Sequence, residues 1–188
     1  MIRPVWSIVT PIARVALAGV WVYAALTKIG DPDAAVRAVR AYQVLPEWLV
    51  EPVAWGLPFL ELALAALLVT GLAPRAAAWA SLVVLGVFVA GIASVWARGL
   101  QIDCGCFGEG GPADVDGFDY FVDIARDVGF AVLALIAALG PDDPLQLRPR
   151  LPSRLRTWAG QAAVLALTVL AATAVGFVVQ RERSELES

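Results

Sequence analysis

Long apolar stretches constrain the fold of this chain more than any other feature. A helix needs about 20 predominantly apolar residues to cross a bilayer core of about 30 Å. Stretches of this kind occupy residues 5–27, 53–70, 76–97, 120–139 and 158–179. The sequence is 60% hydrophobic and 16% charged, whereas a soluble domain has about 45–50% apolar and about 25% charged residues. We therefore predict an all-α, polytopic membrane protein.

The N-terminal part holds one ambiguous stretch and one short helix. Arg3 precedes the first stretch and Ala-Leu-Ala at 16–18 resembles the cleavage site of a signal peptide. Arg14 interrupts the apolar region that such a peptide needs, and apolar sequence continues to Leu26, so we expect a retained span. Residues 34–42 have the apolar spacing of a short surface helix.

Loop charges indicate the orientation of the spans. Five crossings put the N-terminus, the turn at 72–75 and residues 141–156 on one face, and lysines and arginines outside the spans divide equally between the faces. The loop at 141–156 holds the densest basic cluster, and basic loops stay in the cytoplasm. We expect a cell-membrane protein with a cytoplasmic N-terminus and with residues 98–119 outside the cytoplasm.

The inventory of reactive side chains is short. The chain has two cysteines and no histidine. Imidazole bases, Ser-His-Asp triads and the common haem and zinc ligand sets are therefore excluded, and neither a metal nor a haem is expected as a cofactor. A net charge of -3 provides no basic patch for nucleic acid.

The two cysteines form a Cys104-Gly105-Cys106 motif in a loop rich in glycine and acid. Alternate Cα atoms of an extended chain lie about 6–7 Å apart, near the upper limit of about 6.8 Å for a disulfide, and Gly105 allows the chain to bend. A strained, exposed bridge is typical of exchangeable rather than structural disulfides. Two alternatives stay open: buried thiols, which a polar glycine-rich loop disfavours, and a metal site completed through a dimer.

A single cysteine pair also constrains the route of electrons. Once Cys104 and Cys106 have taken two electrons from the thiols of a partner, no second pair in this chain can relay them. The electrons must leave to another protein or to a non-protein acceptor, for which a membrane quinone is the obvious candidate. Electron flow in the reverse direction is equally compatible with these residues.

Charged residues interrupt two of the apolar stretches near mid-membrane. A charge at the centre of a span costs about 2.5–3.5 kcal/mol, and Arg14 and Glu61 are expected at similar depth on antiparallel helices. They can pair, either as a structural ion pair or as a polar site for a quinone headgroup or a proton. A stripe at helical spacing runs from Arg14 to the cysteine face and consists of Arg14, Ala18, Trp21, Ala25 and Lys28.

The fourth stretch begins with charged residues. Asp123 and Asp127 share a helix face, Arg126 lies beside them, and only residues 128–140 are free of charge. That segment is too short to cross a bilayer, so the first turns must be sheltered in the bundle or lie in the interface. An acid near the thiols can accept a proton and an arginine can favour the thiolate. Alternatively, the acids complement the helix dipole.

These motifs together resemble the MauE/DoxX family of redox-associated integral membrane proteins, which includes the methylamine utilisation protein MauE domain. The resemblance covers about residues 10–140 and is carried by Arg14, Lys28-Ile29, Leu-Pro-Phe-Leu-Glu at 57–61, Cys-Gly-Cys-Phe-Gly at 104–108 and Arg126-Asp127. Asp127 departs from the family pattern, which most often has Asn there.

The resemblance implies a four-helix transmembrane bundle, to which this chain adds a fifth C-terminal transmembrane helix, and thiol redox chemistry outside the cytoplasm. The MauE branch is associated with maturation of the disulfide-rich small subunit of methylamine dehydrogenase, often alongside a thioredoxin-like protein. DoxX and DoxD relatives are tied to oxidant defence and to thiosulfate:quinone oxidoreduction.

We predict a MauE/DoxX-like membrane domain at 1–140, an Arg/Pro-rich loop at 141–156, a fifth helix at 157–180 and a polar tail at 181–188. The predicted function is a membrane thiol-disulfide oxidoreductase with Cys104 and Cys106 as the catalytic pair and a thioredoxin-like partner. The expected quinone contacts are Arg14, Lys28, Glu61 and Arg126. The alternative is a non-enzymatic assembly factor or scaffold for an exported disulfide-rich protein. A small-solute transporter is a third option, weakened by the lack of paired broken-helix signals.

Overall fold

Helices make up nearly all of the described chain. The computed structural model describes residues 3–105, 110–141, 160–163, 165–168 and 170, with side chains from residue 6 onward. The elements in chain order are α1 (Arg3–Gly30), α2 (Pro32–Ala41), α3 (Glu47–Thr70), α4 (Pro74–Ala97), β1 (Ile102–Asp103), β2 (Gly111–Pro112) and α5 (Gly117–Leu139). Residues 160–163, 165–168 and 170 are also helical.

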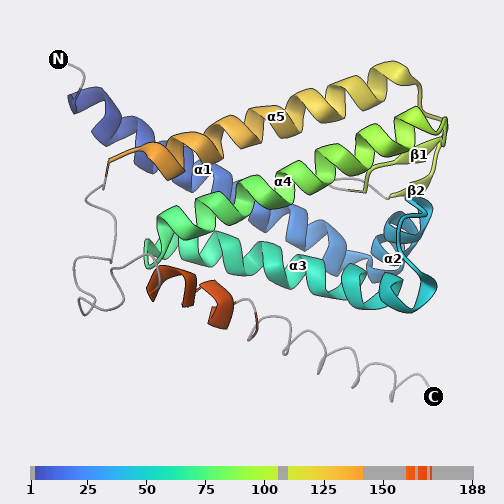
Figure 1. The fold of residues 1–188 in the computed structure, drawn as a ribbon, viewed down its shortest axis with the longest axis horizontal. Coiled ribbons are helices and arrows are strands. Elements are labelled where there is room, and N and C mark those ends of the chain that lie inside the picture. The colour runs from blue at the N-terminus through green and yellow to red at the C-terminus, as the bar shows by residue number, and fades with distance from the viewer. Residues whose placement is uncertain (1–2, 106–109, 142–159, 164, 169, 171–188) are drawn as a thin grey trace.

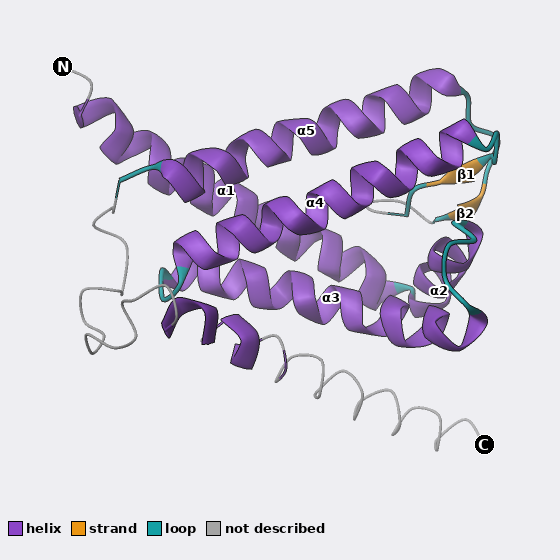
Figure 2. Ribbon diagram, viewed as in Figure 1, coloured by secondary structure: helices purple, strands orange, loops and turns teal. Residues whose placement is uncertain are grey.

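Four long helices form a bundle that is closed at one end by the short elements. α1 packs against α3 and α5, and α4 packs against the same two helices. The four helices run along the long axis of the molecule, and α2 with the β1–β2 hairpin lies at the end where α1 finishes and α5 begins (Figure 1, Figure 2). The cysteine loop therefore shares one end of the bundle with residues 30–47.

Local signals set the ends of the helices. The Asp31 carboxylate caps α2 by accepting from the Ala34 N–H at 2.9 Å, and Pro74 occupies the first turn of α4, where its missing N–H costs nothing. α3 ends at Gly71, whose φ of 63° closes the helix in the left-handed conformation. A capping box formed by Asp116 and Asp119 begins α5.

The bundle interior is mostly apolar, and one of its polar contacts links α1 to α4. Leu17, Leu64 and Leu68 are among its fully buried side chains. Trp21 of α1 donates its indole N–H to the Ser81 hydroxyl of α4 at 2.9 Å. This bond satisfies the one polar atom of a large buried aromatic side chain, so the tryptophan can occupy the core without a desolvation penalty.

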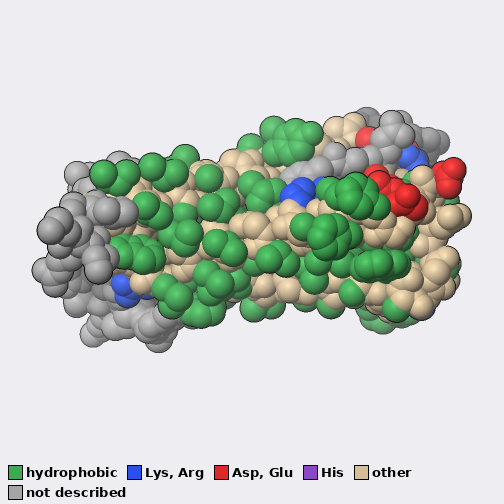
Figure 3. Space-filling view, turned by 90° about the horizontal axis from the view of Figure 1, so that it is seen from above, with side chains coloured by type: hydrophobic (Ala, Val, Ile, Leu, Met, Phe, Trp, Pro, Cys, Tyr) green, Lys and Arg blue, Asp and Glu red, His purple; other side chains and the backbone are tan. Residues whose placement is uncertain are grey.

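Three of the described helices have the length and composition of membrane spans: Trp6–Gly30, Glu47–Thr70 and Pro74–Ala97. α5 is long enough, but its first half carries Asp119, Asp123, Arg126 and Asp127. Figure 3 shows apolar side chains along the bundle and acidic side chains gathered toward the end that carries the hairpin. The chain is a membrane protein whose bundle includes one helix with a charged N-terminal half.

The predicted stretches correspond closely to the helices. Three predicted ends, at residues 70, 97 and 139, coincide with the ends of α3, α4 and α5. The helices begin a few residues earlier than predicted because polar capping residues and prolines extend their first turns. α2 corresponds to the predicted surface helix at 34–42. The loop at 141–156, the tail and most of the fifth predicted helix lie outside the described residues.

Candidate functional site

Cys104 follows the first strand of a small hairpin. β1 and β2 are antiparallel, with Ile102 opposite Pro112 and Asp103 opposite Gly111. Beyond Cys104 the chain turns at Gly105, whose φ is 67°, and the Asp103 carboxylate accepts from the Gly105 N–H at 2.7 Å. A residue with a side chain is strained in this conformation, so the glycine of the motif provides the bend. Cys106 lies outside the described residues.

Helix α2 covers the cysteine loop. A Cβ atom added at Gly105 or at Gly110 would lie 2.5 Å from the Cβ of Ala38, so the small residue on the helix and the two glycines of the loop permit close contact. The Tyr42 hydroxyl, just after α2, donates to the Cys104 carbonyl at 3.0 Å. The loop is therefore held against α2 by both packing and a hydrogen bond.

Tyr120 fixes the base of the hairpin to α5. Its hydroxyl accepts from the Ile102 N–H at 3.0 Å and donates to the Leu100 carbonyl at 2.6 Å. Its ring stacks on Trp96 of α4, with centroids 6.3 Å apart. The strand that leads to Cys104 is therefore fixed to two helices of the bundle.

These contacts bury Cys104, which corrects the expectation of an exposed thiol. Only 8% of its surface is accessible, and it belongs to an apolar cluster with Ile92, Val95, Ile102 and Tyr120. The loop is polar and glycine-rich, as the sequence shows, but its glycines allow α2 to approach and shield the sulfur. Composition alone gave no indication of the helix above it.

Arg126 brings its positive charge to the Cys104 sulfur. Its Nη2 donates to Sγ at 3.6 Å, its Nη1 lies 2.8 Å from Asp123 Oδ1 and its Nε lies 3.4 Å from Asp127 Oδ1. Asp127 is buried and its Oδ2 has no hydrogen-bond partner among the described residues. The sequence left open whether the charged turns of α5 are sheltered in the bundle or lie in the interface. Asp127 is buried, Asp123 and Arg126 are half-buried and Asp119 is exposed, so only the innermost of these charges is enclosed.

Glu61 forms a buried ion pair with Lys28. Lys28 Nζ lies 3.0 Å from Oε1 and 3.3 Å from Oε2 of Glu61, and it also donates to the Ala24 carbonyl at 3.1 Å. The ammonium therefore neutralises a carboxylate that is fully buried in an apolar helix. Two of the four expected quinone contacts lie together on this side of the bundle.

Arg14 lies elsewhere on the same helix. The predicted stripe from Arg14 to Lys28 is buried as a whole, but fourteen residues of α-helix between its ends correspond to about 21 Å of rise. The similar positions of Arg14 and Glu61 within their apolar stretches suggested that these two residues pair. In the structure, Lys28 is the partner of Glu61. Counting positions along the apolar stretches misjudged the pairing because helix bounds do not set how far one helix is displaced along another: Lys28, two residues from the end of α1, reaches Glu61 in the middle of α3.

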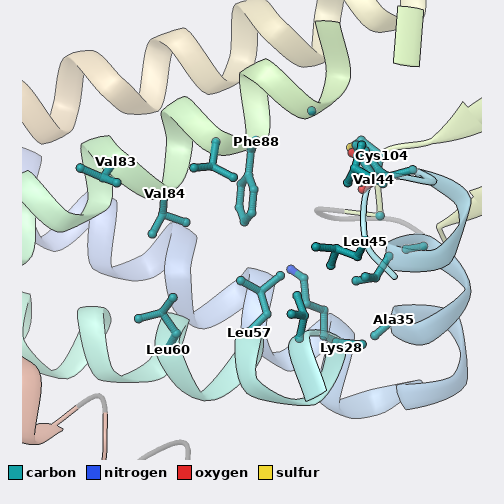
Figure 4. Close-up of a pocket in the computed structure, with 18 residues that line it drawn as sticks. Lys28, Ala35, Val44, Leu45, Leu57, Leu60, Val83, Val84, Phe88 and Cys104 are labelled. Atoms are coloured by element: carbon teal, nitrogen blue, oxygen red, sulfur yellow. Dashed lines mark hydrogen bonds between the residues drawn. The ribbon is translucent and has the colours of Figure 1, made fainter. Parts of the chain in front are cut away.

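A cavity extends from Lys28 to Cys104. It has a volume of about 300 Å³ and lies between α2, α3 and α4, with Lys28 and Cys104 both in its lining. Figure 4 shows Leu57 and Leu60 of α3 facing Val84 and Phe88 of α4 across it. Among the described residues, every lining side chain apart from Lys28, Tyr42 and Cys104 is a hydrocarbon. Arg14 and Arg126 are not part of the lining.

Sequence reasoning missed Ala38, Tyr42 and Tyr120. Ala38 and Tyr42 lie on or beside the short helix that covers the loop, and Tyr120 holds the hairpin. Ala34, Ala35 and Ala38 place small side chains on the buried face of an amphipathic helix. This pattern was the signal in the sequence that another backbone approaches that face. The tyrosines gave no comparable signal, because aromatic residues near span ends are common at membrane interfaces.

The fold and the site together define a polytopic helical membrane protein in which a capping helix and a hairpin hold a cysteine against an arginine at one end of the bundle. A family model described as "Methylamine utilisation protein MauE" matches residues 6–140. The chain belongs to the MauE family.

Two curated relatives carry the same description. The "Methylamine utilization protein MauE" of Paracoccus denitrificans is 39% identical over 129 residues, covering 68% of this chain and 67% of the relative. The protein of that name from Methylorubrum extorquens is 35% identical over 104 residues, covering 55% of this chain and 56% of the relative. No solved structure gives a significant match.

Proposed function

We propose that this protein is a membrane thiol-disulfide oxidoreductase in which Cys104 and Cys106 exchange electrons with a thioredoxin-like partner outside the cytoplasm. The observation that carries the proposal is the 3.6 Å contact between the Arg126 guanidinium and Cys104 Sγ. A cation at hydrogen-bond distance stabilises the thiolate, which is the nucleophile and also the leaving group of disulfide exchange. A purely structural thiol in an apolar cluster gains nothing from this charge.

The exchange conserves electrons and protons. A partner thiolate attacks the Cys104–Cys106 disulfide, a mixed disulfide forms, and the second partner thiol resolves it. The partner then carries the disulfide, and Cys104 and Cys106 carry two electrons and two protons. Arg126 stabilises sulfur as it becomes negative, and the Asp127 carboxylate, which contacts Arg126, is positioned as a proton acceptor nearby. The same steps run backward when the partner supplies the disulfide.

A second reactant must restore the cysteine pair. A membrane quinone accepts two electrons and two protons and leaves as the quinol, so it closes the cycle without a second cysteine pair. The chain offers such a molecule an apolar cavity of about 300 Å³ that touches Cys104, which matches the lower end of the volume range of ligand pockets, about 300–1,000 Å³.

The proposed orientation has five spans, a cytoplasmic N-terminus and the cysteine end of the bundle outside. It rests on the Arg-rich loop at 141–156. In this orientation the thiols meet exported proteins in an oxidising compartment, where disulfides persist. The names of the relatives, together with the family resemblance, point to an exported protein of methylamine metabolism as the substrate of the exchange.

The double variant Cys104→Ser, Cys106→Ser tests the function. Membranes that contain the wild-type protein are expected to oxidise or reduce the dithiol of a thioredoxin-like partner, depending on the direction of flow. The double variant is expected to lose this activity to background because both reacting sulfurs are gone. Ser94→Ala on α4, which leaves both cysteines unchanged, is the control. Unchanged partner oxidation in the double variant contradicts the proposal.

The burial of Cys104 favours a second candidate function, a non-enzymatic assembly factor or scaffold. At 8% exposure the sulfur is poorly accessible to a partner, and the hairpin can act as a docking element. Differential alkylation in redox buffers separates the two functions. A cysteine pair that switches reversibly near the potential of its compartment supports an enzyme, and thiols that never switch support the scaffold.

A further inference from the structure

We propose that the cavity between α2, α3 and α4 is the binding site of the quinone ring, reached from the bilayer through a gap between α3 and α4. This inference rests on the proposed function, because it names the site of the second reactant. It also moves the quinone away from Arg14 and Arg126, which the sequence had suggested as contacts and which do not line the cavity.

The lining of the cavity fits a lipid-soluble ring better than a polar substrate. The opposing walls are leucines and valines of α3 and α4, and Phe88 provides an aromatic face (Figure 4). Edge-to-face contact with Trp21, at a centroid distance of 6.4 Å, holds the Phe88 ring in place. An apolar cleft with a few fixed polar groups is the usual form of a site for a planar hydrophobic ligand.

The mouth of the cavity faces lipid. Val83 and Val87 of α4 are 67% and 63% exposed while they line the cavity, and Val53 on α3 lines it and is 37% exposed. Both helices are membrane spans by length and composition. A ligand that enters between them arrives from the hydrocarbon core, so it must partition into the bilayer, as an isoprenoid quinone does and a soluble dithiol does not.

Two chemical groups in the lining suit a reducible ring. Lys28 Nζ is ion-paired with Glu61, and Lys28 but not Glu61 lines the cavity, so the ammonium is the end of the pair at the cavity wall. A quinone oxygen becomes more negative as the ring is reduced, and an ammonium beside it favours the reduced form. Cys104 lies at another side of the same cavity. When the Cys104–Cys106 bond forms, the two thiols release two electrons and two protons, and the quinone takes up both pairs and leaves as the quinol.

Photo-cross-linking tests the site directly. The full-length protein in lipid nanodiscs is labelled with an azido-ubiquinone, with and without excess decylubiquinone, and the labelled peptides are mapped. We expect saturable label on the segments 53–60 of α3 and 83–88 of α4. Label that excess decylubiquinone does not displace, or label confined to other segments, overturns the proposal and leaves the cavity to lipid acyl chains.

Variants that fill the cavity provide a second readout. Val84→Trp on α4 and Leu57→Trp on α3 insert bulk from opposite walls, and each is expected to lower the competed label at least about tenfold. Val89→Trp is the matched control, because Val89 is on α4 and is not part of the lining. Circular dichroism checks that both cavity-filling variants fold normally. If they do, equal labelling in Val84→Trp, Leu57→Trp and Val89→Trp overturns the proposal.

The proposed function is checked separately in the same preparation. Quinone-free exchange between the wild-type protein and a small dithiol reports on the cysteine pair alone. Saturable, mapped labelling without thiol exchange would reject the oxidoreductase and keep the binding site. Thiol exchange without saturable labelling would reject the binding site and keep the oxidoreductase.

Discussion

Arg126 contacts Cys104 and two acids at once. Variants that remove or keep its positive charge therefore show whether that charge affects the reactivity of Cys104. Its Nη2 lies 3.6 Å from Cys104 Sγ, and its guanidinium forms ion pairs with Asp123 and Asp127. In a Cys106→Ser background, we expect Arg126→Gln to slow alkylation of Cys104 by iodoacetamide about tenfold at neutral pH, since a hydrogen bond to a charged group is worth about 1.5–3 kcal/mol. The rate is measured by mass spectrometry.

The conservative variant Arg126→Lys is the control for this residue. A lysine retains a positive charge near the sulfur but loses the fork that bridges the two acids. The alkylation rate of Arg126→Lys should therefore be closer to the parental rate than the rate of Arg126→Gln is. Equal rates in the parent and in Arg126→Gln would show that the arginine serves only the acids of α5.

At the scale of elements, α2 acts as a cover for the hairpin. Ala38 packs so close to Gly105 and Gly110 that a Cβ atom added at either glycine would lie 2.5 Å from Ala38 Cβ. We expect Ala38→Leu to displace the loop, because overpacking of a close contact costs about 1–3 kcal/mol. Alkylation of Cys104 in the Cys106→Ser background should then be about tenfold faster, as followed by the rate of label incorporation.

The control for the cover is Asp33→Leu, an exposed position on the same helix. It adds a leucine to α2 without contact to the glycines of the loop, so the alkylation rate should stay at the parental value. If Ala38→Leu also alkylates at the parental rate, access to Cys104 is controlled by something other than α2.

At the scale of the whole molecule, the two ends of the bundle are chemically distinct. α2, the hairpin and the exposed Asp114 lie at one end, and the turn from Gly71 to Ala73 lies at the other. In a chain without its native cysteines, Asp114→Cys should react with a membrane-impermeant maleimide in intact cells. Leu72→Cys should react only after the membrane is opened, because the α3–α4 turn is on the cytoplasmic side in the proposed orientation.

The reverse pattern of labelling would invert the orientation. Cys104 and Cys106 would then face the cytoplasm, where thiols are kept reduced. The partner of the exchange would change with the compartment. The arrangement of α1, α3, α4 and α5 in the bundle is the same in both orientations, so this measurement decides the side of the chemistry and leaves the fold unaffected.

Most of the helical architecture could be predicted from the sequence, because its causes are local. The length of an apolar stretch sets whether a helix can cross a bilayer, and the ends at residues 70, 97 and 139 were found in this way. Helical periodicity placed Arg14, Trp21 and Lys28 on one face, and this face is buried. Family membership also followed from short motifs, which are likewise readable along the chain.

The tertiary structure alone decided which of these residues meet. Lys28 rather than Arg14 reaches Glu61, Arg126 reaches Cys104, and α2 shields Cys104, for which the composition of its loop predicted exposure. Each of these contacts depends on the rotation and relative depth of helices that are far apart in sequence, and an apolar stretch specifies neither, because its hydrophobicity is nearly the same on every side. The sequence by itself determined the parts of the bundle and their chemistry, and packing decided their pairing.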